Sequence, residues 1–141
     1  MSGEPSWRER RREVVQAQAD ALARKQAAET ERAKVLVAEF VAAMTAAGVA
    51  PGPLRARAAE GAVRYQTGLR GWYVRRNRAM AVGEDGAFYL LDVPRSTRSR
   101  LLGVRIAPSD PPLQAGVGAR DGESMPLERL LRQRLEAGTD F

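Results

Sequence analysis

The sequence has no cysteine and no histidine among its 141 residues. Without cysteine the chain forms no disulfide and offers no thiolate metal ligand and no thiol nucleophile. Without histidine it lacks the commonest general base and the commonest transition-metal ligand. We therefore expect a protein that is not an enzyme, with no catalytic residues, no metal site and no cofactor.

Long hydrophobic runs are also missing. No stretch of about 18 apolar residues occurs, so we expect no membrane-spanning segment. The first residues, MSGEPSWRERRREVV, are charged but lead into no apolar stretch, so we expect no secretory signal there. With 44% hydrophobic and 28% charged residues, the composition is that of an ordinary soluble chain. We expect a cytoplasmic protein that does not bind membranes.

The net charge of +6 is unevenly distributed along the chain. Residues 49–107 carry 11 basic and 4 acidic groups, whereas residues 1–48 carry 8 and 7 and residues 108–141 carry 4 and 6. All basic residues except Lys25 and Lys34 are arginines. A GC-rich genome would explain the preference for arginine, but it would not explain why the basic residues cluster in the middle of the chain.

Proline and glycine are absent from Trp7 to Ala47, where alanine is abundant. Ser6 and Glu9 have the spacing of a capping box, and Gly48 suits the position that ends a helix in the left-handed conformation. These signals predict one helix of roughly 40 residues, about 60 Å long. We expect residues 1–48 to form this helix and residues 49–141 to form a small α+β domain.

The two halves of the long helix differ in their apolar faces. The second half carries the densest apolar surface of the chain, formed by Val35, Leu36, Val37, Phe40, Val41 and Met44. Because these residues recur every three or four positions, we expect a sheet to pack on them. The first half offers only Val15, Ala19 and Leu22, followed by Gln26 and Glu29. It should therefore either project into solvent or pair with another chain.

After the long helix the apolar period changes to two, which indicates strands. The expected strands are Leu54–Ala58, Ala62–Thr67, Gly71–Arg76, Ala79–Val82 and Ala87–Val93, with weaker signals at Val104–Ala107 and Leu113–Val117. A short helix is expected at Ser96–Leu102 and a final one within residues 126–137. The predicted fold class is α+β, with a long N-terminal α-helix, an antiparallel β-meander of about five strands and a C-terminal α-helix. Its core should include Leu36, Phe40, Met44, Val74, Leu90, Leu131 and Leu135.

Arginines gather on one face of this predicted sheet. Alternation directs Arg55, Arg57 and Arg64 to the same side, because successive side chains of a strand take opposite faces. Guanidinium groups beside aromatic rings can hold phosphates and stack bases. The candidate residues for binding nucleic acid or an acidic partner are Arg55, Arg57, Arg64, Arg75, Arg76, Arg78 and Tyr73. The alternative is a solvated face whose arginines lie across aromatic side chains.

Two further patterns have simpler explanations. The glycines Gly116, Gly118 and Gly122 lack the spacing and the lysine of a phosphate-binding loop, so they predict an ordinary loop. The carboxylate pairs Glu84–Asp85 and Asp121–Glu123 lie in expected turns, where aspartate is common for conformational reasons.

The order of long helix, strands and final helix is similar to that of small bacterial nucleoid-associated proteins and of some secretion chaperones, although no family motif is identified. Two functional hypotheses follow. The first is a non-enzymatic interaction module that docks a protein or self-associates through residues 7–30, using the stripe of Val15, Ala19 and Leu22. The second is a sequence-nonspecific nucleic-acid-binding protein that contacts DNA or RNA with its arginine face.

Overall fold

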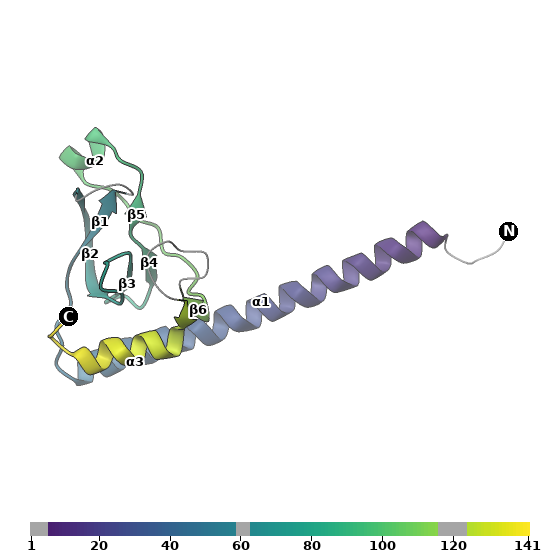
Figure 1. The fold of residues 1–141 in the computed structure, drawn as a ribbon, viewed down its shortest axis with the longest axis horizontal. Coiled ribbons are helices and arrows are strands. Elements are labelled where there is room, and N and C mark those ends of the chain that lie inside the picture. Colours follow the sequence, from purple (N-terminus) through teal and green to yellow (C-terminus); the bar gives the residue numbers. More distant parts are fainter. Residues whose placement is uncertain (1–5, 59–62, 116–123) are drawn as a thin grey trace.

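A computed structural model gives the fold, and it describes residues 6–58, 63–115 and 124–141. The elements are α1 (Trp7–Ala46), β1 (Gly52–Ala58), β2 (Arg64–Tyr73), β3 (Met80–Gly83), β4 (Phe88–Leu90), β5 (Asp92–Val93), α2 (Thr97–Leu102), β6 (Gln114–Ala115), β7 (Met125–Pro126) and α3 (Leu127–Ala137). Figure 1 shows α1 running from the folded part of the molecule far out toward the N-terminus. The predicted α+β class, with its long first helix and its C-terminal helix, is confirmed.

Both ends of α1 have the structure that their sequence predicts. The Glu9 N–H donates to the Ser6 hydroxyl at 3.2 Å, and the Ser6 N–H donates to the Glu9 carboxylate at 3.1 Å, which completes the capping box. At the other end Gly48 has φ +74°, and the Val49 N–H donates to the Met44 carbonyl at 3.0 Å. This left-handed end stops the helix and turns the chain toward β1.

The main sheet has the order β4-β3-β2-β1-β5, and only its β1–β5 pair is parallel. One strand, β2, runs through the region where the sequence predicts two strands and a break. Gly68 has φ +75° within β2, and the β1–β2 register shifts beside it. The Thr67 hydroxyl donates to the Leu54 carbonyl across this shift at 2.6 Å. The glycine therefore marks a bulge within a continuous strand and not a turn between two strands.

The chain crosses from one edge of the sheet to the other at Leu91, between β4 and β5. The Leu91 N–H donates to the Ala79 carbonyl, and its carbonyl accepts from the Arg57 N–H on β1, both at 2.8 Å. The sheet therefore curls around an inner face, where Leu91 is completely buried. The buried residues of this face are Leu54, Ala56, Ala58, Tyr65, Ala81, Tyr89 and Leu91.

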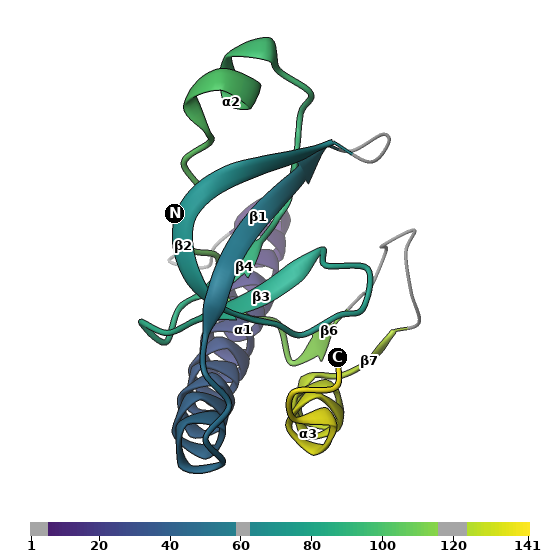
Figure 2. The same cartoon turned by 90° about the vertical axis from the view of Figure 1, so that its left-hand side faces the viewer.

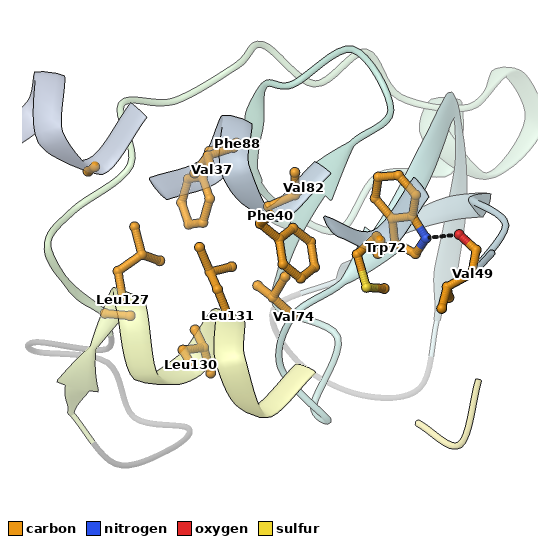
Figure 3. Close-up of a cluster of buried hydrophobic side chains, with 13 residues drawn as sticks. Val37, Phe40, Val49, Trp72, Val74, Val82, Phe88, Leu127, Leu130 and Leu131 are labelled. Carbon is orange, nitrogen blue, oxygen red and sulfur yellow. Dashed lines mark hydrogen bonds between the residues drawn. The ribbon is translucent and has the colours of Figure 1, made fainter. Parts of the chain in front are cut away.

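The other face of the sheet packs on α1 and α3, which lie side by side beneath it (Figure 2). Figure 3 shows side chains from all three elements meeting in this larger core. Its buried members include Ala33, Val37, Phe40, Met44, Trp72, Val74, Val82, Phe88, Leu127, Leu130 and Leu131. Val35 and Leu90 are exceptions to the predicted apolar face and core, because their side chains are 53% and 47% exposed. Leu36 and Leu135 pack against the core while remaining half-buried.

The remaining elements complete the second half of the chain. The short helix predicted at Ser96–Leu102 corresponds to α2, which Ser96 caps and Gly103 ends. Residues 104–107, expected as a strand, form none, although the Val104 N–H donates to the Gln66 carbonyl of β2 at 2.8 Å. α3 begins and ends where its sequence predicts. No helix in the described part of the chain is long and apolar enough to cross a membrane.

Candidate interaction surface

The first part of α1, residues 7–29, is named the arm here. Every residue of the arm is exposed to solvent, and the first half-buried residue of the helix is Thr30. Val15 is 59% exposed and Leu22 is 56% exposed. Trp7 and Val14 are also exposed apolar residues, and the predicted stripe did not include them. The arm thus presents apolar side chains to water and projects away from the rest of the molecule (Figure 1).

Three apolar residues of the arm, Val15, Ala19 and Leu22, lie on the same side of α1 as the core. Val15 precedes the buried Ala33 by 18 residues, and Leu22 precedes the buried Phe40 by the same interval. Eighteen residues make about five full turns of an α-helix, so the members of each pair point in the same direction. Ala19 has the same relation to Val37. The stripe that docks the sheet and α3 therefore continues uncovered along the arm.

Local interactions support the helix in the arm. The Arg11 guanidinium lies 4.7 Å from the centre of the Trp7 ring, and the Gln16 amide donates to the Asp20 carboxylate at 2.9 Å. Such contacts one turn apart stabilise a helix in water by a few tenths of a kcal/mol each. Because α1 is also anchored by its buried second half, the arm can remain helical without covering its apolar stripe.

Three of the candidate arginines, Arg55, Arg57 and Arg64, lie on the β1–β2 hairpin. Arg57 pairs directly with Arg64 across the strands, and Arg55 pairs with Gln66. Arg55 and Arg64 are exposed. Arg57 is half-buried, and its guanidinium forms a two-point ion pair with the carboxylate of Asp92 on β5. Two of the three hairpin arginines therefore present their charge to solvent, whereas the charge of Arg57 is matched by Asp92.

The other predicted arginines lie beyond the opposite end of β2, separated from Arg64 by the length of the strand. Arg75 is buried, and Arg76 lies 5.2 Å from the centre of the Phe141 ring. Arg78, with φ +63°, lies 5.4 Å from the centre of the Tyr73 ring. A continuous β2 explains this separation, because the turn expected near residue 70 would have folded the two groups together.

The aromatic rings near the arginines are largely enclosed. Trp72 is buried in the core, with its indole N–H donating to the Val49 carbonyl at 3.0 Å. Tyr89 is buried on the inner face of the sheet. Tyr73 is half-buried, and its hydroxyl accepts a hydrogen bond from the Arg55 N–H at 2.8 Å. These rings stabilise the fold and leave little surface on which a nucleic-acid base could stack.

A cleft of about 700 Å³ between the β2–β3 turn and α3 was not predicted from the sequence. It is lined in part by Arg76, Arg134 and Phe141. Arg134 is buried, and its guanidinium donates to the carbonyls of Tyr73 and Gly138, both at 2.7 Å. Burial lowers the pKa of Arg134. These bonds give Arg134 a clear structural role, which is to join the end of α3 to β2.

The remaining candidate residues have ordinary roles or lie outside the described residues. Asp85 accepts from the Ala87 N–H at 3.0 Å and from the Tyr89 hydroxyl at 2.7 Å, so both of its oxygens hold the β3–β4 turn. Burial, together with the hydrogen bond to Asp85 and the charge of its carboxylate, raises the pKa of Tyr89 to about 12. Gly116, Gly118, Gly122 and the Asp121–Glu123 pair lie outside the residues that the structure describes.

Comparison of this chain with protein-family models, with curated proteins and with solved structures finds no match. The arm and the arginine-bearing hairpin are therefore the features from which a function can be inferred.

Proposed function

We propose that this protein is a non-enzymatic interaction module that binds another α-helix along its arm. The observation that carries this proposal is the continuation of the core stripe onto residues 7–29, where Val15, Ala19 and Leu22 repeat the directions of Ala33, Val37 and Phe40. In the folded part of the molecule this side of α1 is covered by α3 and the sheet. On the arm the same side is uncovered, and a bound helix would take the position that α3 and the sheet occupy in the folded part.

The energetics favour the binding of another α-helix along this stripe. Burying an exposed Val or Leu side chain contributes about 1.5–3 kcal/mol. An alanine between them lets two helix axes approach closely, as the small residues of helix interfaces do. The rest of the protein holds the arm in a helical conformation, so a partner would not have to induce the fold of its binding surface.

The test compares two double variants of the full chain. Val15→Glu with Leu22→Glu places charge on the stripe, and Ala17→Glu with Ala28→Glu places the same charge on the opposite side of the arm. Chemical cross-linking in the native extract, with and without nuclease, then reports every complex that the chain forms. The proposal is supported if the wild type and the control form the same cross-linked complexes and the stripe variant does not. An identical pattern for all three proteins would contradict it.

The second candidate function is sequence-nonspecific binding of DNA or RNA. It is favoured by the exposure of Arg55 and Arg64 in a segment, residues 49–107, that holds 11 basic and 4 acidic groups. One of those acids, Asp92, already pairs with Arg57. Binding that disappears on nuclease treatment and weakens steeply with salt would support this function over helix docking.

A further inference from the structure

We propose that the helix bound by the arm is the arm of a second copy of this chain, aligned antiparallel, with Val15 packed against Leu22 of the second copy. This inference rests on the proposed function and specifies its partner. The two residues are the largest exposed apolar side chains on the stripe, and the antiparallel register pairs them twice by symmetry. Ala19 lies beside the midpoint, where its small side chain permits close approach.

Charge favours the antiparallel orientation. Residues 7–13 hold four arginines and two glutamates, a net charge of +2, whereas residues 24–30, which face them in this register, hold Arg24, Lys25 and Glu29, a net charge of +1. A parallel pair would place the arginine-rich start of one arm against the arginine-rich start of the other. In the antiparallel pair, Arg8 lies opposite Glu29 of the second copy, because these positions are each two turns outward from Val15 and Leu22. Arg11 lies one turn away from the same carboxylate.

The length of the arm agrees with this register. It sets Trp7 of the second copy opposite Thr30, and Thr30 is the first residue of α1 that is not fully exposed. The paired helix therefore ends where the folded part of the molecule begins. The two folded parts lie at opposite ends of the pair and do not compete for space. Figure 1 shows that the arm is free of the sheet and of α3 over this whole length.

Because the chain has no cysteine, introduced cysteines can report the register directly. Val15→Cys and Leu22→Cys proteins are oxidised separately and as a mixture. The antiparallel register predicts a disulfide only in the mixture, between Cys at position 15 of one chain and Cys at position 22 of the other. Two copies of position 15 lie about 10 Å apart along the axis, beyond disulfide reach. Disulfides formed by each protein alone would overturn the register in favour of a parallel pair.

Charge reversal provides the second measurement, by sedimentation equilibrium of the full chain. Glu29→Arg should weaken dimerisation about tenfold, because it turns two attractions per dimer into repulsions. Adding Arg8→Glu and Arg11→Glu should restore it. Glu13→Arg changes the same charge on the opposite side of the arm and should have little effect. Loss of affinity in Glu13→Arg equal to that in Glu29→Arg would overturn the proposed pairing.

A wild-type chain that remains monomeric and forms no disulfide in any combination would also overturn this inference. Stripe-dependent complexes with other proteins would then still support the proposed function. The two proposals therefore fail on different results.

Discussion

The rings of Phe40 on α1 and Trp72 on β2 meet edge to face, with their centres 6.1 Å apart and their planes at 88°. The Trp72 indole N–H also donates to the carbonyl of Val49, just beyond the end of α1. These contacts fasten the long helix to the sheet at the point where the chain turns back (Figure 3). The direction of the arm depends on this junction.

Replacing Phe40 by alanine should therefore destabilise the protein strongly. The ring is only 4% exposed, and truncating a buried phenylalanine costs about 3–5 kcal/mol. Val35→Ala on the same helix serves as a control, because its side chain is half exposed and its loss should cost about 0.5 kcal/mol or less. Urea titration measures both. A cost below about 1 kcal/mol for Phe40→Ala would contradict the structure of this junction.

Removal of residues 1–29 should leave the remaining domain folded. The arm is exposed along its whole length, and Thr30 can serve as the N-cap of the shortened helix. Trp72 is then the one remaining tryptophan, so its fluorescence reports the core directly. We expect a cooperative thermal transition, with a free energy of unfolding within about 1 kcal/mol of the full chain. A gradual transition would mean that the arm packs within the domain.

The free energy of unfolding should depend on Tyr89 at alkaline pH. The folded pKa is raised from 10.0 to about 12, so the folded state holds its proton more tightly than the unfolded state. The resulting stabilisation is complete below pH 10 and is lost as pH rises toward about 12. In Tyr89→Phe this dependence should be absent, while the lost hydrogen bond to Asp85 costs about 1 kcal/mol at neutral pH. Parallel curves for the two proteins across this range would contradict the assignment.

If the hairpin binds nucleic acid, Arg55 and Arg64 should carry the contacts. Changing both to serine should reduce the slope of log affinity against log salt by about 1.5, since each phosphate contact contributes roughly 0.7–0.9. Arg57→Ser should add less, because Asp92 already matches its charge. Removing residues 1–13 should also change the slope less, because their acidic groups offset much of their basic charge.

Fluorescence anisotropy with a labelled single strand and a labelled duplex gives these slopes. Arg24→Ser with Arg129→Ser is the matched control, because both residues are exposed, one on α1 and one on α3, away from the hairpin. A control that flattens the slope as much as the hairpin variant would contradict this binding face. No binding to either probe at about 50 mM salt would exclude the nucleic-acid function.

The helices could be predicted from the sequence because their signals are local. Ser6, Glu9 and Gly48 define the ends of α1 through residues within one turn of each other. The sheet was harder to predict, because Gly68 has the same appearance in a sequence whether it makes a turn or a bulge. The parallel pairing of β5 with β1 also depends on Leu91 bonding to residues far away in the chain. No local pattern contains that information.

The candidate surfaces show the same limit. Period-two alternation predicted that Arg55, Arg57 and Arg64 share one side of the sheet, but the direct pairing of Arg57 with Arg64 depends on the strand register. The ion pair of Arg57 with Asp92, the burial of Arg75 and the role of Arg134 depend on tertiary packing. On the arm, the sequence predicted the stripe of Val15, Ala19 and Leu22. Whether another helix covers that stripe stays a prediction that only an experiment can test.

Sedimentation equilibrium of the full chain over a concentration series tests most directly the claim that the arm pairs with the arm of a second copy. The wild type and Ala28→Glu should both rise from the chain mass of 15.4 kDa toward twice that value. Leu22→Glu should remain at the chain mass throughout, because it buries a charge on the stripe wherever two arms pair. A wild type that stays at 15.4 kDa, or a Leu22→Glu variant that associates as strongly as the wild type, would contradict this pairing of two arms.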